Sequence, residues 1–272
     1  MNPLTDQTTV AVVGDWHGNT QWAVTALKAL RAEGIKTVYH VGDFGFWPGR
    51  EGEKFLRYVE KHLAIYGITI YVTPGNHEDY AQLTSQPVSD DGLQWFTPHI
   101  AAMPRGFRWE SGGTSFVSLG GAPSINFDDL KSGISWWPEE ALTLGDLYRL
   151  SGEGHADIMI THDAPDGVST LDTLMAYNDA EFARRGESFS EEGKQYAAEG
   201  RKLMTHAVKI VQPEMLFHGH YHHDYMEVVD FKDEGVFSTR IVGLNMDRRH
   251  NNICLLNTET KAVEWFPLEP LH

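Results

Sequence analysis

Short apolar runs alternate with helical patterns along the first third of the chain. Residues 9–13 are β-branched or apolar throughout and stop at Gly14, which predicts a strand buried on both faces. Apolar residues at helical spacing predict the next element: Trp22, Ala26, Leu27 and Leu30. Gly34 marks the end of this helix. The segment therefore predicts a β-turn-α unit.

The same pattern returns further along. Residues 37–41 predict a second buried strand, and Phe55, Val59 and Leu63 predict the helix that follows it. Further short apolar runs, each ending near Gly, Pro, Thr or His, predict strands at 68–72, 115–119, 157–160 and 214–217. Strands that alternate with helices in this way are typical of an α/β fold.

Two later regions depart from this alternation. Between 171 and 209, Ala, Glu, Lys and Arg dominate and apolar residues recur at helical spacing, so we expect a helical excursion packed on the core. Apolar runs at 238–242, 252–256 and 262–266 are too closely spaced for intervening helices and predict a largely antiparallel sheet. Neither a repeat nor a Pro/Ser-rich linker interrupts the sequence, so residues 1–272 are expected to form a single domain.

Composition excludes several classes of protein. The 272 residues are 41% hydrophobic and 22% charged, which is typical of a globular protein rather than a disordered one. A formal charge of −16 opposes stable binding to nucleic acid. Cys254 is the single cysteine and lies in an apolar run, as expected of a buried thiol in a reducing compartment. Without a signal-like start or a membrane-length apolar stretch, a cytoplasmic location without membrane association is expected. The oligomeric state is left open.

Residue types that bind metals follow five of the predicted strands. They lie in short turns, most of them glycine-containing: Asp15 and His17, Asp43, Asn76 and His77, His162, and His220 and His222. The carboxyl ends of strands in an open α/β sheet meet at one edge, so these distant turns are expected to converge. In extended backbone, Asp-x-His and His-x-His would each place two donors on one face. This mixture of nitrogen and oxygen donors favours Mn, Fe, Zn, Co or Ni over Ca.

In order and kind, these turns resemble the signature blocks of the calcineurin-like metallophosphoesterase superfamily. The matching blocks are Gly14-Asp15-x-His17-Gly18, Gly42-Asp43, Gly75-Asn76-His77-Glu78, His162 and Gly219-His220-x-His222. The resemblance implies a four-layer α/β sandwich, in which two central mixed β-sheets are flanked by helices. It also implies a two-metal centre at one edge that hydrolyses phosphoesters through a bridging water.

The resemblance further implies a role for each residue. The first metal would be bound by Asp15, His17, Asp43 and His222. The second would be bound by Asp43, Asn76, His162 and His220. Asp43 would then bridge two divalent ions, with Mn as the first expectation and Fe, Zn, Co or Ni as alternatives. His77 would be a catalytic non-ligand beside Asp43 and Asn76, donating to the phosphoryl group or protonating the leaving oxygen.

The second block differs from that of the superfamily's protein phosphatases. After Gly42-Asp43 the chain reads Phe44-Gly45-Phe46-Trp47, without the Asp-Arg pair in which the Asp orients the catalytic His. We therefore expect a small phosphorylated substrate, such as a nucleotide, with phosphodiesters such as cyclic nucleotides slightly favoured. Glu78, Asp79 and Asp163 remain as candidates for orienting His77. Aromatic residues near these turns could form a stacking wall or simply pack: Phe44, Trp47, Trp136 and Trp137.

Three alternatives use the same residues. A phosphomonoesterase would need additional cations, for which Arg50, Arg105 and Arg108 are candidates. A nuclease is disfavoured by the negative charge. A catalytically inert binding scaffold is least favoured, because each of the seven expected ligands is retained.

Overall fold

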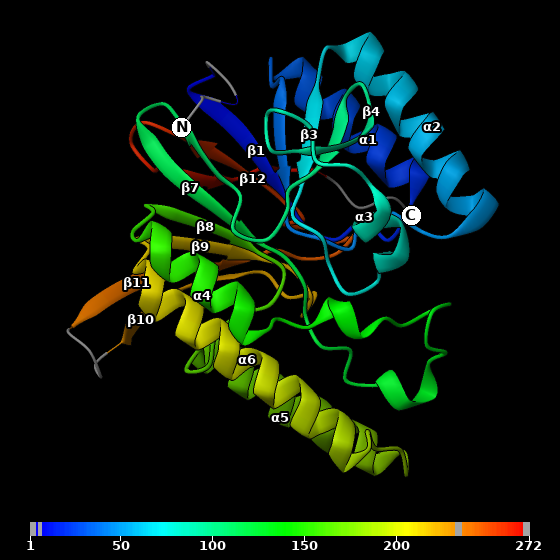
Figure 1. Cartoon of the computed structure of the whole chain (residues 1–272), viewed down its shortest axis with the longest axis vertical. Coiled ribbons are helices and arrows are strands. Elements are labelled where there is room, and N and C mark those ends of the chain that lie inside the picture. The colour runs from blue at the N-terminus through cyan, green and yellow to red at the C-terminus, as the bar shows by residue number, and fades with distance from the viewer. Residues whose placement is uncertain (1–3, 5–6, 232–235, 269–272) are drawn as a thin grey trace.

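Two stacked β-sheets covered by helices form the fold (Figure 1). The computed structural model describes residues 4, 7–231 and 236–268. The seven-stranded sheet runs, in spatial order, β13 (Val263–Trp265), β12 (Ile253–Asn257), β1 (Thr9–Val13), β2 (Thr37–His40), β3 (Thr69–Val72), β5 (Ile100–Ala102) and β4 (Gln94–Thr97). The six-stranded sheet runs β10 (Tyr225–Phe231), β11 (Phe237–Gly243), β9 (Met215–His218), β8 (Ile158–Thr161), β7 (Thr114–Leu119) and β6 (Arg108–Ser111).

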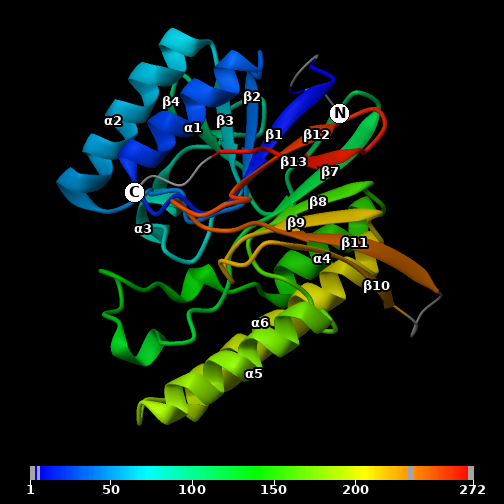
Figure 2. The ribbon, with the colours of Figure 1, turned by 180° about the vertical axis from the view of Figure 1, so that it is seen from behind.

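Helices cover the outer face of each sheet (Figures 1 and 2). The seven-stranded sheet carries α1 (Thr20–Ala32) and α2 (Gly49–Tyr66), and the short α3 (Tyr80–Ser85) follows β3. The six-stranded sheet carries α4 (Leu144–Glu153), α5 (Ser169–Arg184) and α6 (Glu191–Val211). This helix-sheet-sheet-helix order confirms the predicted four-layer sandwich. Within the described residues, none of the helices is both long and apolar enough to cross a bilayer.

The alternation of side chains along β1 shows how the layers form. Val10 and Val12 are buried between the two sheets, whereas Ala11 and Val13 are buried against the helices of the seven-stranded sheet. Burying one such valine contributes about 1.5–3 kcal/mol. A central strand that is apolar on both faces can therefore hold the inner and outer layers together.

The predicted helical excursion is confirmed and consists of two helices. In α6, Met204 and Val208 pack with Leu147 and Leu150 of α4 against the six-stranded sheet. The paired α5 and α6 continue well beyond the sheets, as seen from both sides (Figures 1 and 2). Their far ends therefore form an arm that projects from the sandwich.

The expectation of one antiparallel sheet in the last quarter is wrong. Strand β11 joins the six-stranded sheet, parallel to β9 and antiparallel to β10. Strands β12 and β13 instead form an antiparallel edge on the seven-stranded sheet beside β1. Closely spaced strands exclude intervening helices, but they do not exclude a crossing from one sheet to the other.

Candidate metal centre

The predicted donor residues all lie on loops that directly follow strands of the two sheets. Asp15 and His17 follow β1, Asp43 follows β2, and Asn76 and His77 follow β3, all in the seven-stranded sheet. His162 follows β8, and His220 and His222 follow β9, in the six-stranded sheet. The two sheets thus meet at one edge of the sandwich, and this edge carries predicted donor residues from both sheets.

Four of these side chains form one compact group. Asp15, His17, Asp43 and His222 each offer a donor atom within 4.8 Å of the others. Nε2 of His222 lies 3.2 Å from Oδ2 of Asp15, and Nε2 of His17 lies 3.6 Å from Oδ2 of Asp43. Both carboxylates are buried, whereas the His222 side chain is 36% exposed. The group is therefore open to solvent on the side of His222.

A second group lies on the other side of Asp43. Oδ1 of Asn76 is 2.9 Å from Nε2 of His162 and 3.0 Å from Nδ1 of His220. The same Nε2 of His162 is 3.4 Å from Oδ1 of Asp43. One oxygen of Asp43 thus faces His17 and the other faces His162, so this carboxylate lies between the two groups.

The hydrogen bonds around the groups show that they fit cations. Nδ1 of His162 lies 2.8 Å from the carbonyl oxygen of Val41, which can only accept, so Nδ1 carries the proton. In neutral His162 the lone pair of Nε2 then points at another acceptor, Oδ1 of Asn76. Oδ1 of Asp15 is buried without a hydrogen-bond partner in the described part of the chain. A divalent ion would satisfy each of these atoms, and this mixed donor set suits Mn, Fe or Zn.

The pKa shifts indicate a negative potential at this edge. Burial lowers the pKa of His17, but hydrogen bonds to Asp247 and Asp43 and nearby negative charges raise it to about 10. Burial likewise lowers the pKa of His162, but Asp43 and Asp15 raise it to about 9. Such a potential favours any bound cation.

The backbone of this site is not extended, contrary to the expectation for the Asp-x-His and His-x-His spacings. His17, Asp43, His220 and His222 have φ values of +45°, +49°, +64° and +51°. Each left-handed non-glycine residue costs of the order of 1–3 kcal/mol. The loops therefore coil, and this bends donors that are one residue apart toward common points.

Hydrogen bonds between loops hold this strained backbone in place. The N–H of His17 donates to the Asp43 carbonyl at 2.7 Å, and the N–H of His77 donates to Oδ1 of Asp43 at 2.9 Å. The loops approach so closely that a Cβ added at Gly75 would lie 2.2 Å from Oδ1 of Asp43. A side chain at position 75 would therefore displace the Asp43 carboxylate.

Asp247 is a residue of the site that the sequence analysis missed. Its Oδ1 lies 3.2 Å from Nδ1 of His17, and its Oδ2 accepts from the Asn19 amide at 2.6 Å. Its backbone N–H also donates to the carbonyl of Asp15 at 2.7 Å. The carboxylate can thus keep the proton of His17 on Nδ1 and leave Nε2 free to face the centre.

Ser124 and Glu140 were also missed. The Asn76 amide nitrogen donates to Oγ of Ser124 at 3.0 Å, and Oγ donates to Oε2 of Glu140 at 2.8 Å. Glu140 is fully buried and also accepts from the Ser124 N–H and from Nε1 of Trp136. This series of hydrogen bonds from Asn76 to Glu140 fixes the orientation of the Asn76 amide, so that its oxygen faces His162 and His220. Nothing in the local sequence around Ser124 signals such a contact.

His77 lies at the mouth of the site. Its side chain is exposed, and its ring centroid lies 6.0 Å from that of His17. Both imidazoles line a cavity of about 240 Å³, together with Trp47 and Trp137. His77 is therefore placed where it can reach a molecule that approaches the donor residues.

The three carboxylates proposed to orient His77 are engaged elsewhere. Glu78 accepts from the backbone N–H groups of Phe44 and Phe46. Asp79 caps α3 by accepting from the N–H of Gln82, and Asp163 accepts from the hydroxyl of Tyr221. Of the aromatic residues that could stack or pack, Phe44 packs in the core and is fully buried. Of the wall candidates, Trp47 and Trp137 line the cavity.

A layered α/β sandwich with an edge rich in carboxylates and imidazoles is typical of metal-dependent hydrolases. A family model described as calcineurin-like phosphoesterase matches residues 8–224, and the chain belongs to this family. No curated protein matches the chain.

Several solved structures align with nearly the whole chain, and two of them, with TM-scores above 0.5, share its fold. One aligns over 95% of this chain and 98% of its own, with 13% identity and a TM-score of 0.57. TT1561 of Thermus thermophilus aligns over 94% and 96%, with 11% identity and a TM-score of 0.51. An archaeal phosphodiesterase covers 96% and 99% at 13% identity, with a TM-score of 0.43. At these identities the likeness concerns the fold alone.

Proposed function

We propose that the chain is a two-metal phosphodiesterase for small phosphorylated molecules, with Mn²⁺ as the preferred ion. The position of Asp43 carries this proposal, because its two oxygens face His17 on one side and His162 on the other. We assign the first ion to Asp15, His17, Asp43 and His222, and the second to Asp43, Asn76, His162 and His220. Because residues of both sheets contribute, the chain would act as one catalytic domain.

When bound, two divalent ions would activate a water and polarise the phosphoryl oxygens for in-line attack. The protein's own groups would orient the reactants. Asp247 would fix the tautomer of His17, and Ser124 would hold the Asn76 amide. His77, anchored through its backbone to Asp43, would present its imidazole to the phosphoryl group or to the leaving oxygen.

Two of the three candidate arginines, Arg105 and Arg108, are already engaged, which supports a diester over a monoester. A monoester dianion carries a second charge that an enzyme commonly neutralises with additional cations. Arg105 donates to the carbonyls of Gly120, Ala141, Glu139 and Glu140, and Arg108 donates to those of Gly154 and His155. Both guanidinium groups are therefore held by backbone. The net charge of −16 also disfavours long nucleic acids as substrates.

The test uses protein stripped of metal with a chelator and reloaded with Mn²⁺. Bis(4-nitrophenyl) phosphate, 4-nitrophenyl phosphate, and 2′,3′- and 3′,5′-cyclic nucleotides are compared as substrates. We expect Mn²⁺-dependent hydrolysis in which kcat/KM for the diester exceeds that for the monoester at least tenfold. Asp43→Asn should abolish it, whereas Asp90→Asn on an exposed loop should not. A monoester preference would contradict the diester assignment, and full activity of Asp43→Asn would contradict the two-metal mechanism.

A further inference from the structure

A second and larger cavity lies between α5 and α6, directly beside the candidate metal centre. Its volume is about 590 Å³, and His220 and His222 form part of its wall. Wall residues on α5 recur at helical spacing, as Leu174, Met175 and Phe182 show. Cavities that bind small organic molecules span about 300–1,000 Å³, so this one has the size of a binding site.

The wall of this cavity is mainly apolar. Leu174 and Met175 lie on one side, and Phe182 and Phe189 form an edge-to-face pair with centroids 5.2 Å apart. Its two basic side chains are paired with neighbours: Lys194 lies 3.0 Å from Glu191, and Arg201 binds the Pro165 carbonyl and Asp172. The cavity therefore suits an uncharged apolar group better than a second phosphate.

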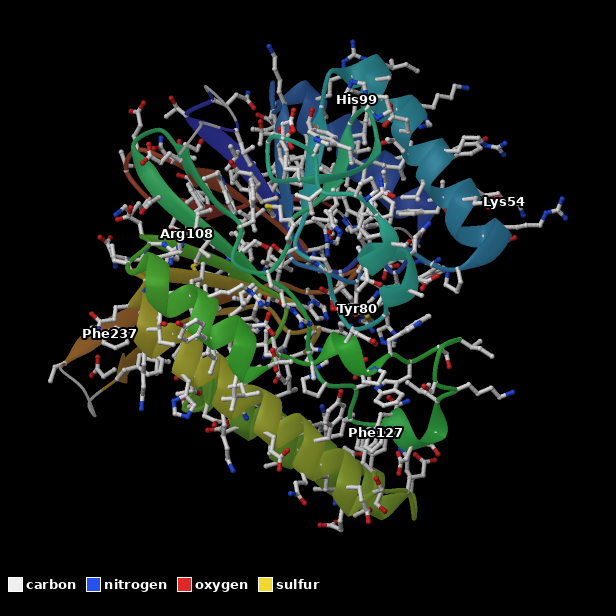
Figure 3. All side chains as sticks on the ribbon, in the orientation of Figure 1. Lys54, Tyr80, His99, Arg108, Phe127 and Phe237 are labelled. Atoms are coloured by element: carbon white, nitrogen blue, oxygen red, sulfur yellow. The ribbon has the colours of Figure 1, made fainter. Side chains whose placement is uncertain are left out.

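The surrounding packing explains why the cavity stays open. Two glycines of α6 let the segment after β7 lie directly against the helix. A Cβ added at Gly200 would lie 2.3 Å from Cγ of Pro123, and one at Gly193 would lie 2.0 Å from the carbonyl oxygen of Ile125. Phe127 of the same segment packs edge-to-face on Tyr196, with centroids 5.0 Å apart (Figure 3). The segment thus supports α6 from one side, while Ala197 and Ala198 line the cavity with small side chains.

We propose that this cavity binds an apolar alkyl or aryl group of the substrate, attached through an ester bond to the phosphate at the metal centre. The inference rests on the proposed phosphodiesterase function and narrows its substrate class. The shared residues support it: His222 belongs to the compact donor group, His220 lies beside Asn76, and both also line the cavity. A phosphate held at the proposed ions would therefore have the cavity immediately beside it.

The test compares two phosphodiesters with the same leaving group, methyl 4-nitrophenyl phosphate and octyl 4-nitrophenyl phosphate. Each buried methylene is worth about fourfold in binding, so the octyl ester should have a kcat/KM at least about tenfold higher. Ala198→Trp should fill the cavity and bring the ratio of the two kcat/KM values to about one. Ala180→Trp, on an exposed part of α5 away from the cavity, is the matched control and should preserve the ratio.

A binding measurement separates this inference from the proposed function. Calorimetric titration of Mn²⁺-loaded protein with octylphosphonate and methylphosphonate should show tighter binding of the octyl compound, and Ala198→Trp should remove the difference. Equal affinities, or a difference that survives Ala198→Trp, would overturn the inference even if the methyl ester is hydrolysed. A cavity-dependent difference in affinity without hydrolysis of either ester would overturn the proposed function; the cavity would then still bind an alkyl group, but not as part of a hydrolysed substrate.

Discussion

Nδ1 of His17 lies 3.2 Å from Oδ1 of Asp247, a carboxylate 230 positions further along the chain. Residues that orient a metal ligand in this way commonly affect metal affinity 10–100-fold. We therefore expect Asp247→Ala to weaken Mn²⁺ binding by about 10–100-fold, measured by metal titration of the stripped protein. Asp90→Ala, at an exposed position, serves as the control. Unchanged affinity in Asp247→Ala would show that this carboxylate does not support the centre.

The hydrogen-bonded chain from Asn76 through Ser124 to Glu140 gives a second prediction. Ser124→Ala should free the Asn76 amide to rotate, and we expect a loss of about tenfold in affinity for one of two bound ions. Ser124→Thr keeps the hydroxyl and should bind both ions with unchanged affinity. Metal stoichiometry distinguishes positioning from general destabilisation, which urea unfolding measures separately. Equal metal affinities in the two variants would contradict the positioning role.

His77 should contribute to turnover and not to metal binding. Its imidazole is exposed beside His17 at the mouth of the site. General acid catalysis contributes about 10²–10⁴-fold, so His77→Ala should lower kcat by that factor while the bound metal is unchanged. The exposed His250 provides the control variant His250→Ala. Loss of metal from His77→Ala would instead make this residue a ligand.

Glu227 makes the docking of α5 depend on pH. Its carboxylate accepts from the N–H and hydroxyl of Ser169 and from the N–H of Thr170, at the first turn of α5. Slight burial raises the pKa of Glu227, but these hydrogen bonds lower it from 4.5 to about 2. The stabilisation is therefore complete above about pH 4.5 and is lost as the pH falls toward 2.

We expect Glu227→Gln to lower the free energy of unfolding at pH 7 by about 1 kcal/mol or less, because this carboxylate is only partly buried. The difference from the unmodified protein should shrink as the pH falls below about 4.5. Urea unfolding at pH 7 and pH 3 measures it, with Glu264→Gln at an exposed position as the control. A difference that is the same at both pH values would contradict the role assigned to Glu227.

Patterns within single segments predicted much of the fold. The buried strands β1 and β2 and the helix α1 were found because their apolar residues repeat with a clear period. Strand β10 was missed, because exposed Met226 and Val228 interrupt the expected alternation at the edge of a sheet. The sheet to which 238–242 belongs depends on contacts with β9 and β10, which no local pattern encodes.

In the candidate site, too, residues marked by a local pattern were predicted, and residues that depend on distant contacts were missed. Asp15 and His17 stand out because glycines and a buried strand surround them, and the structure brings both to the predicted edge. Asp247 also follows a strand, β11, but neither a glycine nor a histidine stands next to it, and only the folded chain brings it to His17. The left-handed backbone of His17 could not be predicted either, because loop contacts with Asp43 impose it.

The division of the donor residues between the two sheets has a consequence for cooperativity. Asp15 and Asp43 belong to one sheet and His162 and His222 to the other, so neither layer alone holds a complete set. A pair of bound ions would link the two sheets, because each sheet supplies part of the donor set. Catalytic activity would then depend on the relative position of the two sheets. Mild denaturation would abolish the activity while the hydrogen bonds within each sheet are still intact.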